Sequence, residues 1–178
     1  MLGIDPLGLD SVMLDEARAY LRLESGEEDA PLAAIILAAI GHAEGFIGQL
    51  VVRRGVRQIL PSSATWQRLG AGPVQAVTVV TGIPAEGATF ALMPSAYAVD
   101  IDINGDGHIR VMQPGSAGRV EVAYQAGLAA EWAELPEALR LGILRLTAHL
   151  HAHRDASDDS GPPAAVAVLL RPWRRVRF

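Results

Sequence analysis

The 178-residue chain contains no cysteine and no lysine. The absence of cysteine excludes disulfides, thiolate metal ligands and cysteine nucleophiles, and it favours folding in a reducing cytoplasm. All fifteen basic residues are arginine, so no lysine is present to complete a phosphate-binding loop. The chain also lacks an uninterrupted apolar run of about 18 residues, and its first residues are acidic, so we expect neither a membrane span nor a signal peptide.

Positive charge is scarce overall and unevenly placed. The formal net charge of −5 argues against a protein whose main task is to grip a nucleic-acid backbone. Residues 1–29 hold eight acids and two arginines, whereas residues 171–178 hold four arginines and no acid. This polarity predicts two different docking ends. Half of the residues are apolar, which is enough for a real hydrophobic core.

Apolar residues spaced three and four apart predict two helices in the first part of the chain. The first covers about residues 11–23. The second covers about residues 30–50, with Asp29 as the expected N-cap and Pro31 in the first turn. Its length and regular spacing make it the clearest amphipathic helix in the sequence.

A third helix is expected from Pro136 to about His153. It carries two apolar stripes, which consist of Leu139, Ile143, Leu146 and Leu150, and of Leu141, Leu144 and Ala148. One stripe can face the core of the chain while the other packs on something else. We therefore expect Leu141, Leu144 and Ala148 to form a subunit interface.

Between these helices the apolar period changes from about 3.6 to two, which indicates strands. We predict a mostly antiparallel β-module of five to seven short strands at residues 51–125, with its plainest hairpin around residues 104–107. The expected fold class is α+β, a small bundle of three main helices plus a C-terminal tail, with this module inserted. The helical core would comprise residues 1–50 and 126–154, and residues 155–178 a linker and an arginine-rich docking tail.

Asp102, Asn104 and Asp106 match the opening of a calcium-binding loop, with oxygen ligands at alternate positions followed by glycine. The twelfth position, however, is Gln113 where such a loop needs a bidentate glutamate, and the flanks are predicted strands instead of helices. A tight hairpin turn needs the same residue types for backbone reasons. We therefore favour a turn and predict no metal site, with calcium as the weaker alternative.

The histidines near the end of the third helix offer a second possible metal site. His149 and His153 lie four residues apart and so share a helix face, but no acid is clearly placed to complete a site. Cationic residues are also favourable at a helix C-terminus without any metal.

No nucleophile with a base and an orienting group is recognisable, so we predict no catalytic residues, no cofactor and no enzymatic activity.

Three stretches resemble the head-tail connector family of tailed phages and gene transfer agents, in the variant with a β-insertion. The first runs from Leu14 to Arg22 and continues through the acids ending at Asp29 into the long helix. The second is residues 122–128 leading into residues 135–139 and the third helix. The third is residues 162–172 with the terminal arginine cluster.

The resemblance implies a structural adaptor in the neck of a virion or phage-like particle. Such adaptors form a ring of about twelve copies below the portal protein, contact a stopper or tail-completion protein on the tail side, and let DNA pass through the lumen without sequence-specific binding. It implies portal docking by a tail that comprises Arg171, Trp173, Arg174, Arg175, Arg177 and Phe178. Alternatives that remain open are a small calcium-responsive binding module and an assembly chaperone that is not retained in the particle.

Overall fold

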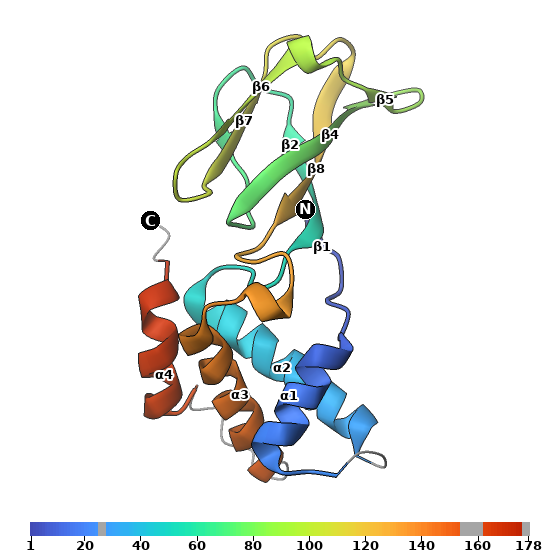
Figure 1. Ribbon diagram of the computed structural model, residues 1–178. Coiled ribbons are helices and arrows are strands. Elements are labelled where there is room, and N and C mark those ends of the chain that lie inside the picture. The colour runs from blue at the N-terminus through green and yellow to red at the C-terminus, as the bar shows by residue number, and fades with distance from the viewer. Residues whose placement is uncertain (25–27, 154–161, 176–178) are drawn as a thin grey trace. The chain divides into compact units, whose positions relative to one another are not determined.

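The computed structural model describes residues 1–24, 28–153 and 162–175. Its described residues form helices and two antiparallel sheets, so the expected α+β class is confirmed (Figure 1). The chain divides into two compact units. The β unit comprises residues 1–6 and 52–128, and the helical unit comprises residues 7–51 and 129–178.

The β unit contains a five-stranded and a three-stranded antiparallel sheet. The larger sheet has the order β1-β2-β8-β4-β5, with bounds Leu2–Ile4, Arg54–Pro61, Ala117–Ala126, Val74–Pro84 and Phe90–Ala91. The smaller sheet has the order β3-β7-β6, with bounds Gln67–Arg68, Gly107–Val111 and Tyr97–Ile101. A short 3-10 helix, Pro94–Ala96, precedes β6.

Strand β8 lies at the centre of the larger sheet, between β2 and β4. Its residues Val120, Val122 and Tyr124 are buried, as their alternation predicts. The Tyr124 hydroxyl accepts a hydrogen bond from the Ala71 amide at 3.0 Å and donates one to the Gln58 side chain at 3.2 Å. The single polar atom of this buried tyrosine is therefore satisfied, which lets a large ring fill the core.

The predicted hairpin is present as β6 and β7, whose pairing runs from Tyr97 with Val111 to Ile101 with Gly107.

The position of strand β1 corrects the expected boundaries of the helical core. Leu2 to Ile4 pair with β2, so residues 1–6 belong to the β unit and not to the helical core. Residues 126–128 also lie in the β unit, because β8 extends through Ala126.

The helical unit contains α1 (Ser11–Leu21), α2 (Asp29–Ile47), α3 (Glu137–Ala152) and α4 (Ala164–Leu170). The 3-10 helices Trp132–Glu134 and Arg171–Trp173 precede α3 and follow α4. In Figure 1, α3 lies between α4 and the pair of α1 and α2. The three predicted helices are therefore present with nearly the expected ends.

The helix ends differ from expectation at Asp29. Glu28 occupies the N-cap position of α2, but its side chain makes no capping hydrogen bond to the helix, and Asp29 is the first helical residue. The Asp29 carboxylate instead accepts hydrogen bonds from Arg18 on α1. In contrast, α1 has a side-chain cap, since Asp10 accepts a hydrogen bond from the Met13 amide at 2.7 Å.

Helix α4 corrects the interpretation of residues 155–178 as a separate linker and tail. Its Val166 and Leu170 are buried, and the segment belongs to the helical unit. Gly142 of α3 allows the close approach, because a Cβ there would lie 3.0 Å from the Leu170 side chain. Residues 154–161, which include most of the expected linker, lie outside the described residues.

Helix α2 has the length and hydropathy of a membrane-spanning segment, with 19 residues and a mean hydropathy of 1.7. The core helix of a globular protein satisfies the same criteria. In the helical unit α2 buries a regular stripe that consists of Leu32, Ile36, Ala39, Ile40, Ala43 and Ile47. This stripe packs against α1, α3 and α4, which accounts for its apolar composition.

Candidate functional site

The expected docking tail begins as a segment held against the C-terminal end of α2. The Gln49 side chain donates a hydrogen bond to the Trp173 carbonyl, and the Arg175 amide donates one to the Ile47 carbonyl at 2.8 Å. The Arg174 guanidinium lies 5.5 Å from the centroid of the Phe46 ring. Helix α2 has no basic residue in its last turn, so these arginines bring positive charge to its negative end.

The tail residues differ in accessibility. Arg171 and Arg174 are exposed, whereas Trp173 and Arg175 are partly buried. Arg177 and Phe178 lie outside the described residues. The structure therefore brings four of the six predicted docking residues together and leaves two arginines available at the surface.

A second candidate surface is an open pocket of about 620 Å³ between α1, α3 and α4. Its apolar and aromatic lining consists of Ala19, Tyr20, Ala138, Leu141, Leu144 and Leu169. Two of the predicted interface residues, Leu141 and Leu144, thus line one concavity. Leu144 is 6% exposed because its own chain already covers most of it, and Ala148 does not line the pocket.

Some of the polar residues at the pocket edge already form hydrogen bonds or ion pairs within the chain. The Glu16 carboxylate accepts a hydrogen bond from the Trp132 indole at 2.7 Å and forms an ion pair with Arg140 at 3.1 Å. Glu137, in the first turn of α3, is exposed. Sequence reasoning missed this network, because its members are separated by more than 100 residues and follow no local motif.

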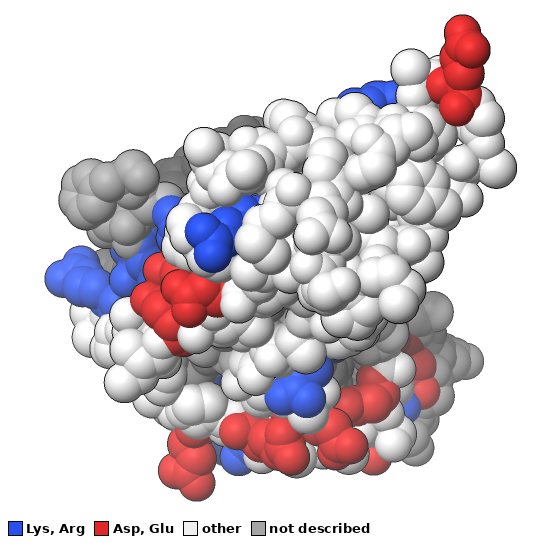
Figure 2. Space-filling view, turned by 90° about the horizontal axis from the view of Figure 1, so that it is seen from above, with Lys and Arg blue, Asp and Glu red and all other residues white. Residues whose placement is uncertain are grey.

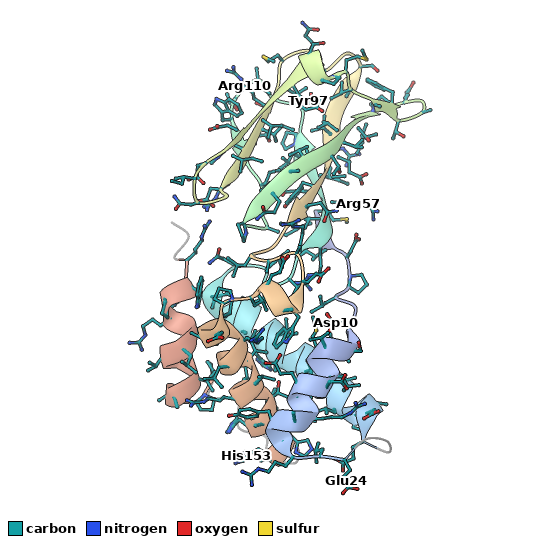
Figure 3. All side chains as sticks on the ribbon, viewed as in Figure 1. Asp10, Glu24, Arg57, Tyr97, Arg110 and His153 are labelled. Atoms are coloured by element: carbon teal, nitrogen blue, oxygen red, sulfur yellow. The ribbon has the colours of Figure 1, made fainter. Side chains whose placement is uncertain are left out.

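The β unit carries its own exposed apolar and aromatic side chains. Trp66 is 46% exposed and lies under the guanidinium of Arg110, which is 4.7 Å from the ring centroid. Arg110 and Tyr97 are labelled on the strands β7 and β6 in Figure 3. Ile103 in the hairpin turn is fully exposed, and Met93 is 71% exposed. Met93 precedes β6 and Ile103 follows it, so these two exposed side chains lie beyond opposite ends of one strand.

The candidate calcium residues form a turn stabilised by the protein itself. One Asp102 carboxylate oxygen accepts hydrogen bonds from the amides of Asn104 and Asp106 at 2.9 and 2.7 Å. The Asp106 carboxylate forms an ion pair with Arg68 at 2.7 Å. Gly105 has a φ of 77°, as the tight turn requires. These contacts are those of a hairpin turn, and a cationic side chain already neutralises Asp106.

The two histidines in the last turn of α3 and the C-cap residue His153 contact protein groups. The rings of His149 and His153 lie 4.4 Å apart, and the His153 ring nitrogen Nδ1 lies 2.9 Å from the His149 carbonyl. His151 lies 3.6 Å from the Glu28 carboxylate. Within the described parts of the chain, no three His, Asp or Glu side chains are grouped as metal ligands would be.

Charge on the surface is dispersed on the face shown in Figure 2. Arginine and acidic side chains occur there as separate small clusters on a largely uncharged surface. A protein that held DNA tightly would need a continuous basic footprint. The face in Figure 2 offers none, in keeping with the net charge of −5.

Comparisons with known proteins identify similar chains in gene transfer agent (GTA) particles. The chain aligns over 100% of its length with 97% of a chain from the neck of an empty GTA particle with C6 symmetry, at 28% identity and a TM-score of 0.80. Chains from the virion of a native GTA particle and from the neck of a native GTA particle with C12 symmetry align over the same shares, at 27% identity and TM-scores of 0.79 and 0.78. No family model and no curated protein matches the chain.

The similarity covers both units, including the inserted β unit. It confirms the resemblance to the head-tail connector family and its variant with a β-insertion. Two of these similar chains come from structures of particle necks and one from a virion, which are structural assemblies.

Proposed function

We propose that the chain is a structural neck subunit of a gene transfer agent or related tailed-phage particle, a head-to-tail adaptor without catalysis of its own. The observation that carries this proposal is the similarity to GTA neck chains over the whole length, at a TM-score of 0.80. Partial similarity could reflect a shared helical bundle alone. Here the bundle, the inserted β unit and α4 all align, so the entire architecture of a neck component is present.

The symmetry of the similar assemblies supports a ring. The similar chains occur in GTA neck structures that were computed with C6 and with C12 symmetry. We infer a ring of about twelve copies, in which one heterologous contact repeats around the axis. DNA would pass through its lumen. The net charge of −5 suits this passage, because an acidic subunit allows a polyanion to slide without holding it.

We assign a docking partner to the C-terminal tail and another to the β unit from the groups that each of them exposes. Arg174 is exposed at the start of the tail, and Arg177 and Phe178 follow it. This cationic end would dock on an acidic surface of the portal protein. The β unit, with Trp66, Ile103 and other exposed apolar residues, would contact the stopper or tail-completion protein.

Electron microscopy of particles tests the assignment. Particles that carry a tagged chain should show the tag at the neck, and deletion of its gene should give filled heads without attached tails. A chain that supports assembly but is missing from purified particles would be an assembly chaperone instead. Gene order offers a first check, because genes for a portal and a major capsid protein should lie upstream.

The portal-docking role of the tail has a separate test. Charge reversal at Arg174 and Arg177 should weaken binding to the portal and leave the fold of the chain intact. Arg145→Glu is a matched control, because Arg145 is an exposed arginine on α3 outside the tail. Equal loss of portal binding in the tail variant and in this control would contradict docking through the tail.

A further inference from the structure

The helical unit carries an open, partly apolar concave surface. The pocket between α1, α3 and α4 has a volume of about 620 Å³, and Ala19, Ala138 and Leu141 form part of its lining. Ala19 and Ala138 are small, and the larger side chains of Tyr20, Leu141, Leu144 and Leu169 complete the lining, so the surface is open enough for a protruding side chain of another chain to enter it. A volume of this size accommodates several side chains at once.

The rim of this pocket favours a cationic partner. Glu16 and Arg140 neutralise one another in an ion pair of 3.1 Å. Glu137 is exposed, and among the described residues it has no ion-pair partner. The rim therefore retains one uncompensated negative charge beside an apolar floor.

The outer face of α4 carries an exposed apolar side chain and a charge opposite to that of the rim. Ala164, Val168 and Arg171 lie at positions i, i+4 and i+7, so they share one helical face. All three are exposed, and Val168 is 62% exposed, the highest value among the large apolar side chains of the described helical unit. Arg171 has no ion-pair partner among the described residues. This face is a narrow apolar ridge that ends in a positive charge.

The ridge and the pocket are different surfaces of one chain. Leu169, which lines the pocket, lies about 100° around the helix from Val168, so the ridge points away from the pocket of its own chain. A ring contact needs two such non-overlapping, complementary surfaces on every subunit, whereas a two-fold dimer would use one surface twice. A second copy of this chain is therefore the occupant that shape, charge and ring symmetry favour together.

We propose that the α4 ridge of one copy enters the α1–α3–α4 pocket of the next copy around the ring. Val168 then packs on the floor that contains Leu141, and Arg171 pairs with Glu137 of the neighbouring copy. This inference rests on the proposed ring function. Under this proposal Arg171 belongs to the contact between copies and not to the portal-docking tail. Arg174 and the residues after it keep the proposed role of binding the portal.

Disulfide cross-linking tests the contact cleanly, because the chain has no cysteine of its own. Particles that carry Ala138→Cys and Val168→Cys in the same chain should, after mild oxidation, give a ladder of covalent multimers on a non-reducing gel. Each single variant should give none. In a control, Leu37→Cys replaces Val168→Cys. Leu37 is exposed, at 37%, on α2, which contributes no residue to the pocket, so this pair should give no ladder.

Charge exchange tests the ion pair. Arg171→Glu should lower the cross-linking yield several-fold, because it places two like charges together, and the combination of Arg171→Glu with Glu137→Arg should restore the yield. A purely structural role of either residue would not give such mutual rescue.

The outcomes separate this contact from the function on which it rests. Dimers without higher multimers would overturn the ring contact in favour of a two-fold pair. Particles with the chain at the neck but no ladder would overturn the α4–pocket contact and leave the adaptor function standing, with the pocket open to another neck component. Particles without the chain at the neck would contradict the adaptor function itself.

Discussion

The indole of Trp132 donates a hydrogen bond of 2.7 Å to the carboxylate of Glu16, across 116 residues of sequence. Trp132 is 1% exposed, so its nitrogen has no access to water. The same carboxylate pairs with Arg140 on α3. Glu16 therefore joins α1, the turn before α3 and α3 itself, and it fixes one wall of the pocket that we assign to the contact between copies.

Replacement of Glu16 should destabilise the helical unit. Glu16→Ala leaves the Trp132 nitrogen buried without an acceptor, and we expect a loss of about 1–3 kcal/mol in the free energy of unfolding. Glu16→Gln keeps an acceptor and should cost less. Urea unfolding followed by circular dichroism measures both, with Glu24→Ala as an exposed control on the same unit. A loss in Glu16→Ala no larger than in the control would contradict the role assigned to the hydrogen bond.

The ion pair between Arg18 and Asp29 should contribute less to the free energy of unfolding than the hydrogen bond between Glu16 and Trp132, although the geometry of the ion pair is good. The Arg18 guanidinium donates bonds of 2.8 and 2.5 Å to the two Asp29 oxygens and also pairs with Asp15. Both partners are partly accessible to water, so a double-mutant cycle with Arg18→Met and Asp29→Asn should give a small favourable coupling that decreases as salt is added. A coupling near zero in low salt would show that the pair is only incidental.

The same pair predicts how this coupling depends on alkaline pH. The hydrogen bond to Asp29 raises the pKa of Arg18, and the charges of Asp29 and Asp15 add to the effect. A basic group with a raised folded pKa stabilises fully below its unfolded pKa and loses this effect only as the pH rises through the folded value. The coupling should therefore be constant from neutral pH to moderately alkaline pH. If the coupling energy measured in the same double-mutant cycle decreased between neutral and moderately alkaline pH, a titrating group other than Arg18 would have to cause the decrease.

The sequence predicted the long elements because their patterns are local. The period of α2 and the alternation in β8 each repeat within one segment, so burial follows from the residues themselves. Strand β1 could not be predicted in this way, since three residues carry no period and pair with β2 more than 50 residues away. Helix α4 was interpreted as part of a tail because it is short and because its packing partners on α2 and α3, Gly142 among them, are distant in sequence.

For the candidate site too, the sequence predicted what depends on a local pattern and missed what depends on contacts between distant segments. The apolar stripe on the third helix indicated that Leu141 and Leu144 have a special environment, and both line the pocket. The pocket itself depends on α1, α3 and α4, which are distant in sequence. The N-cap assigned to Asp29 was wrong because a partner on another helix, Arg18, binds its carboxylate. Local rules cannot foresee such competition between helices.

Gly127 should not tolerate a side chain. Its φ is 151°, and a Cβ there would lie 2.5 Å from the Arg53 amide nitrogen and equally close to other backbone atoms of residues 52 and 53. Backbone cannot move aside as a flexible side chain can, so Gly127→Ala should cost about 2 kcal/mol or more in the β unit. Gly118→Ala is the matched control, because it lies on β8 and a Cβ there meets no atom within 4 Å. Equal thermal stability of the two variants would contradict the close backbone approach.

The turn between β6 and β7 should respond to loss of Asp102 and not to calcium. Asp102→Ala removes the acceptor for the amides of Asn104 and Asp106, and we expect a loss of about 1 kcal/mol from the β unit. Asp100→Ala, an exposed change on the adjoining strand, should have little effect. Millimolar calcium should give no heat in calorimetry and no rise in Tm, because Arg68 already pairs with Asp106. A calcium-dependent rise in Tm that Asp102→Ala abolishes would instead favour the calcium-responsive module, since a ligand that binds only the folded state must stabilise it.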